Sequence, residues 1–267
     1  MATDHRKSIA GDYEKYAAVA EEAGARLLGR MDGLRFSPKL IVELGCATGR
    51  DLSALRQRFP KAIILGIDRS RSMLREARRR KGWWRPRFQL AEADAASLPL
   101  ADHSADMAFV NLTPSWCGHP GELLSEARRV LEPGGLLLVS VFGPDTLREL
   151  SGEQTLSIQS VMDVQALGRE LVQRGFSEPV LDTDWLTTNY SSRETMIQEL
   201  NGAGFLSRSS TDDVPTEAVK PVSIKWEIVS ASAWAPQPGQ PIRSTGGEEV
   251  SIPVSQIGRR QRRSSEP

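Results

Sequence analysis

The sequence predicts an α/β fold with a doubly wound, mostly parallel Rossmann-like sheet of about seven strands and helices on both faces. Short apolar segments alternate with segments of helical periodicity from residue 39 onward. Residues 62–67 are almost continuously apolar, which is typical of a strand buried on both faces. A glycine-containing loop at residues 43–49 follows the first apolar segment, where such folds bind nucleotides.

The first half of the chain supplies the clearest periodic patterns. Residues 8–30 are expected to form a helix, because apolar residues recur there at steps of three and four. A strand at 39–44 ends at a glycine, and residues 52–59 have helical spacing. After the strand at 62–67, Ser70 is suited to cap a helix at 72–80.

The second half continues the alternation, and a turn is expected at Glu132-Pro133-Gly134-Gly135. Right-handed crossovers place the carboxyl ends of the parallel strands at one edge of the sheet. The expected strands are 88–91, 105–110, 136–142, 181–190 and 222–230, and the expected helices are 121–131, 145–150 and 161–174.

The composition excludes several classes of protein. The 267 residues contain 34 Lys and Arg against 34 Asp and Glu, so no overall field favours nucleic acid or an anionic membrane as partner. No apolar segment is long enough to span a bilayer, and the amino terminus has no secretory signal. Cys46 and Cys117 are therefore expected to be reduced, in a cytoplasmic protein. The histidines are scattered, and no metal site is expected.

Three regions are expected: residues 1–30 with the first helix, a main domain at 31–235, and a mostly disordered tail at 236–267. The tail begins with a proline-rich segment at 236–241 and ends in a basic, polar segment at 258–263. No internal repeat is present.

The loop at residues 43–49 decides which nucleotide is expected. A dinucleotide fingerprint starting at Gly45 would need glycine where Ala47 and Arg50 stand. The spacing acid-x-Gly-x-Gly-x-Gly fits better, with Ala47 in place of one glycine, and that alanine is expected to be tolerated if its φ is negative. A carboxylate at Glu43 repels a pyrophosphate but suits S-adenosylmethionine (SAM), which carries an ammonium and a sulfonium. Backbone N–H groups at the helix start can hold the carboxylate of SAM.

Polar residues end the next strands as well. Asp68 ends the second strand about 20 residues beyond the loop, the spacing expected for an acid that binds ribose hydroxyls. Asp94 and Ala95 follow the third strand, where they could accept from the adenine amino group. Asn111 ends the fourth strand and faces the same edge. The alternative is that these are ordinary turn residues, which is credible for each alone but not for all together.

The segments 43–49, 98–102 and 128–135, together with Asp68, resemble class I SAM-dependent methyltransferases. That resemblance implies that Arg69 and Met73 flank the adenosine. The cofactor-binding residues expected from pattern and resemblance together are Glu43, Gly45, Cys46, Ala47, Gly49, Asp68, Arg69, Met73, Asp94, Ala95 and Asn111.

More narrowly, the chain is similar to the BioC-type malonyl-acyl-carrier-protein O-methyltransferases of biotin synthesis. The signs are the segments 78–88 and 142–150 and Asn111-Leu112 with Trp116. The resemblance implies methylation of the free carboxylate of a malonyl thioester, with acyl-carrier protein as partner. It also implies that residues 1–30 form a lid over SAM and that Tyr13 and Trp116 line the substrate pocket, although both could equally be core aromatics.

Two alternatives remain open: a SAM-dependent methyltransferase acting on another small molecule, and a non-catalytic assembly factor of the same fold. The segment 113–115 and the short region 202–221 depart from the family pattern and favour the second alternative. No catalytic base is expected, because a carboxylate acceptor is already ionised at neutral pH. The basic segment 78–87 could be a solvated helix end, a dock for an acidic carrier protein or, least favoured, a nucleic-acid surface.

Overall fold

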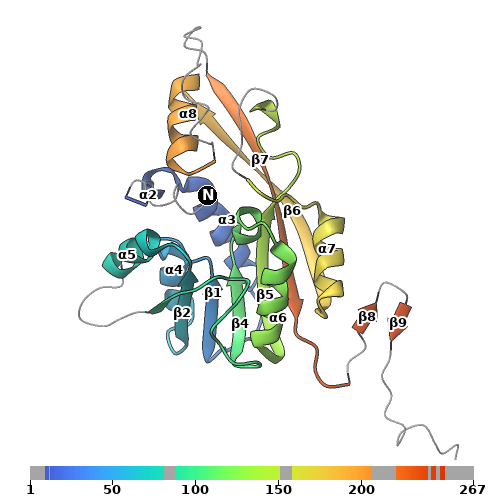
Figure 1. Cartoon of the computed structure of the whole chain (residues 1–267). Helices are drawn as coiled ribbons and strands as arrows, with labels where there is room; N and C mark the ends of the chain where they lie inside the picture. Colours follow the sequence, from blue (N-terminus) through green and yellow to red (C-terminus); the bar gives the residue numbers. More distant parts are fainter. Residues whose placement is uncertain are drawn as a thin grey trace, which may run out of the picture.

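The computed structural model describes residues 10–11, 13–80, 88–150, 158–205, 221–239, 242–244 and 247–249. Its centre is a seven-stranded sheet in the order β3-β2-β1-β4-β5-β7-β6 (Figure 1). The first five strands pair in parallel, whereas β7 runs antiparallel to both β5 and β6. The expected fold class is confirmed. The strands are β1 Leu40–Leu44, β2 Ile63–Asp68, β3 Gln89–Glu92, β4 Ala105–Val110, β5 Leu131–Phe142, β6 Ser177–Tyr190 and β7 Val222–Trp234.

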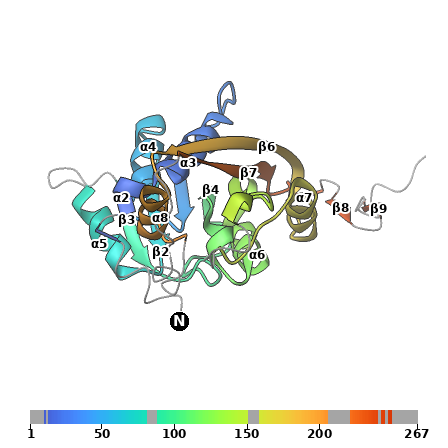
Figure 2. The same ribbon diagram turned by 90° about the horizontal axis from the view of Figure 1, so that it is seen from above.

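Helices cover both faces of the sheet, as seen from above in Figure 2. The first face packs against α3 (Ala18–Gly29), α4 (Arg50–Arg58) and α5 (Arg71–Arg80) through one buried apolar cluster. The second face packs against α6 (Pro120–Val130) and α7 (Val164–Gln173) through another. The two apolar faces explain why the central strands are nearly continuous in apolar residues.

A third apolar cluster lies beyond the carboxyl ends of the parallel strands. It joins α3 to α8 (Arg193–Gly202) and to the ends of β5, β6 and β7. The ring of Tyr16, on the short helix α2 (Tyr13–Tyr16), packs so closely on Gly202 that a Cβ there would collide with it. The helices α2 and α8 therefore lie at the same end of the molecule (Figure 1).

Several expected elements differ from the observed ones. The helix expected at 8–30 is divided at Ala17 into α2 and α3. The helix expected at 145–150 is only the 3₁₀ turn η2 at Arg148–Leu150, because Leu147 has a left-handed φ of 57°. The turn expected at 132–135 interrupts pairing inside β5, since Leu131 pairs with Ala105 and the ladder resumes at Leu136.

The structure also contains elements that the sequence pattern did not indicate. Helix α8 begins at Ser192, whose side chain accepts a hydrogen bond from the N–H of Thr195, and it buries Met196, Ile197 and Leu200. Within the expected tail, β8 (Ile242–Ser244) pairs antiparallel with β9 (Gly247–Glu249). The basic segment 258–263 and the tryptophans at 83 and 84 lie outside the described residues.

None of the helices in the described part of the chain has the length and apolar character needed to span a bilayer.

Candidate active site

The loop after β1 is tied to the end of β2. The N–H groups of Gly45 and Cys46 donate to the carbonyl of Ile67 at 2.7 and 3.0 Å. The next N–H, that of Ala47, donates to Oδ2 of Asp68 at 2.9 Å. Glycine at position 49 then precedes α4 with φ of 77° and donates to the carbonyl of Cys46. The loop is thus held in place by the neighbouring parallel strand.

Ala47 adopts a φ of 43°, so the condition of a negative φ, under which an alanine would be tolerated at this position, is not met. Its N–H must point at Asp68 to complete the loop, and that requirement places the residue in the left-handed region. A side chain in this region costs about 1–2 kcal/mol. The alanine is therefore strained, and the acid at the end of β2 holds the strained conformation in place.

The segment 113–115, which departs from the family pattern, supports the loop from behind. It forms the first turn of η1 (Thr113–Trp116), and Oγ1 of Thr113 donates to the carbonyl of Leu44 at 2.7 Å. The same side chain lies directly against Gly45, where any Cβ would collide with it. Oγ of Ser115 accepts from the N–H of Phe142 at 2.8 Å. The residues at 113–115 that depart from the family pattern are therefore ordered and pack against the loop.

A small cavity of about 40 Å³ opens between the loop, α4, the end of β4 and the amino-terminal helices. Sites for small molecules usually enclose roughly 300–1,000 Å³. The cavity is therefore too small to hold a nucleoside with α2 and the first turns of α3 in their present positions. It is lined by Tyr13, Ala17, Ala20, Glu21, Glu43, Gly45, Cys46, Ala47, Thr48, Arg50, Asp51 and Asn111.

Glu43 is the most unusual residue in this cavity. Its side chain is only 2% exposed, and Oε2 is buried without a hydrogen-bond partner. Burial, and then the charges of Asp51 and Asp68, raise the pKa of Glu43 well above its ordinary value. A buried carboxylate without a partner is costly unless a cation joins it. The residue therefore fits the expected role of binding a positively charged ligand.

Asn111 connects three elements around the cavity. Its Nδ2 donates to Oδ2 of Asp51 and to the carbonyl of Ala20, both at 2.8 Å. Its Oδ1 accepts from Oγ of Ser140 at 2.9 Å. Asn111 lies at the carboxyl edge as expected, but its amide links α3, α4 and β5, which the sequence did not indicate.

Ion pairs close the cavity on the side of the amino-terminal helices. Glu14 of α2 accepts from Thr48 and Arg50 and pairs with Arg80 at 2.7 Å. Arg50 also pairs with Glu21 of α3. Burial alone would raise the pKa of Glu14, but hydrogen bonds from Thr48 and Arg50 and the charges of Arg80 and Arg50 hold it below its ordinary value. The charged form of Glu14 therefore stabilises the closed position of α2.

The other expected cofactor residues surround the cavity without lining it. Asp68 is 3% exposed, and its Oδ1 accepts from the N–H of Ser70 at 2.8 Å, so both oxygens already hold backbone groups. Met73 is a buried residue of α5, and Arg69 is half-buried. Asp94 is exposed and caps its own turn through the N–H of Ala96, with Ala95 half-buried between them. Their contacts to ribose and adenine stay predictions.

The two aromatic residues expected at the substrate pocket lie in different places. Tyr13 lines the small cavity. Trp116 ends η1 and packs against Phe142 and Phe205, with ring centroids 6.5 and 5.1 Å away. It belongs to the apolar cluster beyond the sheet edge. The structure therefore brings Tyr13, but not Trp116, to the loop at residues 43–49.

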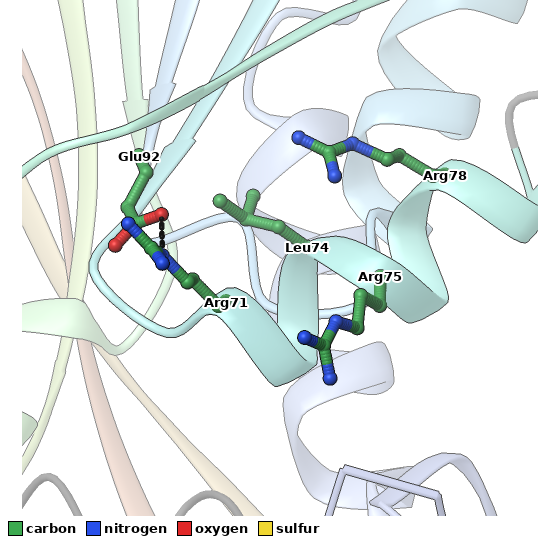
Figure 3. Close-up of a pocket in the computed structure, with 5 residues that line it drawn as sticks. All are labelled: Arg71, Leu74, Arg75, Arg78 and Glu92. Carbon is green, nitrogen blue, oxygen red and sulfur yellow. Dashed lines mark hydrogen bonds and ion pairs between the residues drawn. The ribbon is translucent and has the colours of Figure 1, made fainter.

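A second hollow, of about 320 Å³, lies between α5 and β3 (Figure 3). Arg71 pairs with Glu92 at 2.6 Å, while Arg75 and Arg78 are exposed on α5 and leave the helix in different directions. Leu74 forms its apolar floor. Of the expected basic segment 78–87, the structure describes Arg78, Arg79 and Arg80, and of these three Arg78 lines the hollow.

Several residues of the small cavity were missed by the sequence reasoning. Asp51 and Arg50 lie in the first turn of α4, where charged residues are common on any helix. Glu14 and Glu21 lie in an amphipathic helix far away along the sequence. The signal that could have identified Asp51 was its position directly after the glycine-containing loop, where an acid can face a cationic ligand. Among the described residues, no cluster of three His, Cys, Asp or Glu could hold a metal ion.

Comparison with known proteins places the chain among methyltransferases. Residues 42–139 match the family model described as a methyltransferase domain. The 1,6-didemethyltoxoflavin N1-methyltransferase of Burkholderia thailandensis shares the fold with a TM-score of 0.51 at 16% identity, covering 87% of each chain.

Two relatives are named malonyl-(acyl-carrier protein) O-methyltransferase. That of Xylella fastidiosa (strain M23) is 33% identical over 96% of this chain and 94% of its own length. That of Coxiella burnetii, numbered 1, is 30% identical over 95% of this chain and 93% of its own length. The chain therefore belongs to the malonyl-(acyl-carrier protein) O-methyltransferase family, and it is a SAM-dependent methyltransferase.

Proposed function

We propose that this enzyme methylates the free carboxylate of a malonyl thioester carried on acyl-carrier protein, as a step of biotin biosynthesis. The observation that carries the proposal is the buried, unpartnered Oε2 of Glu43 in a small cavity at the sheet edge. It supports a cationic methyl donor, and the names of the two relatives support the acceptor. Esterification removes a charge that apolar chain-extension sites cannot bury cheaply.

The residues present fit SAM. The backbone of residues 45–49 approaches the cavity closely because Gly45 has no Cβ and Thr113 fills the space behind it. We propose that Glu43 faces the ammonium group, that N–H groups at the start of α4 face the carboxylate, and that Asp68 faces the ribose. Bound SAM supplies an electrophilic methyl group on a sulfonium.

The protein's own contribution is alignment and exclusion of water. A carboxylate acceptor is ionised at neutral pH and needs no general base. We propose that residues 1–30 act as a lid, with α2 closing over the cavity through the ion pairs of Glu14. Holding two reactants in line inside a closed site can lower a barrier by about 7–11 kcal/mol.

We further propose that the arginine side of α5 receives the carrier protein. Arg75 and Arg78 are exposed beside the hollow of Figure 3, in a chain whose net charge is zero. A local basic surface on a neutral protein steers an acidic partner without attracting anions everywhere. The helix ends at Arg80, which pairs with Glu14, so this surface adjoins the proposed lid.

The test is incubation of malonyl-carrier protein with SAM followed by mass spectrometry of the intact carrier protein. A mass gain of one methyl group is expected. Acetyl-carrier protein is the matched control, because it lacks the free carboxylate and should gain nothing. Restored growth of a biotin auxotroph by the gene is the corresponding result in cells.

The alternatives give different results in the same experiments. A methyltransferase for another small molecule would bind SAM but leave the malonyl-carrier protein unchanged. An assembly factor that had lost the cofactor would show no binding of SAM by calorimetry. Either result would reject the proposed function.

A further inference from the structure

Asp51 lies beside Glu43 at the same small cavity. It stands in the first turn of α4, and its Oδ2 accepts from Nδ2 of Asn111 at 2.8 Å. Helix α3 covers it at Gly24, where a Cβ would lie 2.6 Å from Oδ1. Asp51 is therefore enclosed by β4 and α3 and lines the cavity together with Glu43.

The two carboxylates are not balanced by the cations around them. Arg50 is the cation that lowers the pKa of Asp51, but it is already paired with Glu14 and Glu21. Burial raises the pKa of Asp51 to about 6, although the hydrogen bond from Asn111 and the charge of Arg50 oppose the change. Oε2 of Glu43 has no partner at all. The small cavity therefore presents two acids and too little positive charge.

We propose that Asp51 is a second binding residue for the ammonium group at the methionine end of SAM, held between Asp51 and Glu43. This inference rests on the proposed function for the identity of the cofactor, and it adds a residue for which neither the sequence pattern nor the family resemblance gave a role. An ammonium presents three N–H donors, which can serve two carboxylates at once. Asn111 acts as a positioning residue, since its amide fixes the orientation of Asp51.

The proposal makes a compound without the ammonium group a poor ligand. Its binding would close the helices over two acids that gain no counter-charge. It also makes affinity depend on pH, because both acids must ionise to hold a cation. The groups that face Asp51 and contribute to this dependence are Glu43 on β1, Arg50 on α4, Asn111 directly after β4, Glu21 on α3 and Glu14 on α2.

The test measures binding of S-adenosylhomocysteine (SAH) and of its deaminated analogue by calorimetry at pH 7, where an α-amino group is still charged. Asp51→Asn keeps an acceptor for Asn111 but removes the charge. It should weaken SAH binding by about 10- to 100-fold, the range for a lost hydrogen bond to a charged group. Affinity for the deaminated analogue should change by less than about 3-fold. Asp102→Asn, at an exposed acid paired with Arg129, is the matched control and should change neither affinity.

Two outcomes would overturn the proposal. Equal weakening of both ligands by Asp51→Asn would mean that Asp51 acts only through packing, and unchanged SAH affinity would mean that it does not contact the cofactor. A second measurement needs no variant: the affinity of the native protein for SAH should fall below pH 6 more steeply than its affinity for the analogue, and parallel profiles would also refute the proposal. SAH binding does not depend on the methyl acceptor, so a negative result with malonyl-carrier protein leaves this test intact.

Discussion

Replacing Asp51 by asparagine should stabilise the ligand-free protein at neutral pH. Most substitutions of a hydrogen-bonded residue destabilise, so the expected sign is unusual. Burial raises the pKa of this carboxyl from 3.8 to about 6 in the folded protein. The change costs the ionised folded state about 3 kcal/mol, because a tenfold change in proton affinity corresponds to about 1.4 kcal/mol. The asparagine variant carries no such cost.

The sign of the pH dependence follows from the raised pKa. Below about pH 4 the carboxyl is protonated in both the folded and the unfolded chain, so ionisation costs nothing there. The cost grows as the pH rises from 3.8 and is complete above 6. The difference in free energy of unfolding between variant and native protein should therefore be near zero at pH 4 and reach up to about 3 kcal/mol at pH 7.5.

Urea unfolding of the ligand-free protein between pH 4 and 8 measures this difference directly. Asp102→Asn is the control, because an exposed ion pair contributes at most about 1 kcal/mol and should show no rise over the same range. If Asp51→Asn is less stable than the native protein at pH 7.5, the carboxylate is a structural group, and the electrostatic reasoning about the cavity fails.

Three further substitutions test other parts of the site. Ala47→Gly should raise the free energy of unfolding, measured by urea titration, by roughly 0.5–1 kcal/mol, because glycine adopts the left-handed φ without strain. The gain is partly offset because glycine makes the unfolded chain more flexible. A loss of stability would contradict this reasoning. Tyr13→Phe should lower methyl transfer more than thermal stability, and equal activity would reject its role at the cofactor. Reversing Arg75 and Arg78 to glutamate should raise KM for the carrier-bound substrate roughly tenfold, about 1.4 kcal/mol, with SAH affinity unchanged; an unchanged KM would place the carrier elsewhere.

Local signals in the sequence were sufficient for the sheet and for the loop. The strand expected at 105–110 matches β4 in both bounds, because four consecutive apolar residues at 107–110 follow a segment of turn-forming residues. The acid, the glycines and the position after β1 identified the loop without any knowledge of the third dimension. Periodicity predicted the amino-terminal helix but not its break at Ala17, where α2 turns toward Thr48 and Arg50.

The rest of the site depends on contacts between distant parts of the chain. Asp51 looks like an ordinary acid in a first helical turn until Gly24 and Asn111 are brought against it. No local pattern states that residues 24, 51 and 111 meet. The φ of Ala47 likewise follows from a hydrogen bond to Asp68 and not from its own neighbours. Sequence reasoning therefore located the loop after β1 but missed the charged residues that complete the cavity beside it.

The unfavourable features of the cavity share one explanation. Ala47 is strained, Oε2 of Glu43 is buried without a hydrogen-bond partner, and burial raises the pKa of Asp51. All three residues line one small cavity or its loop, or both. Other acids packed against α3, such as Asp184, are paired with arginine. A core selected only for stability would not gather three such costs around one loop, whereas a site that awaits a cation would. A positively charged ligand would offset the cost of burying Glu43 and Asp51, whereas the strain of Ala47 is held by its hydrogen bond to Asp68. That offset would bind the cofactor and hold the amino-terminal helices closed over it.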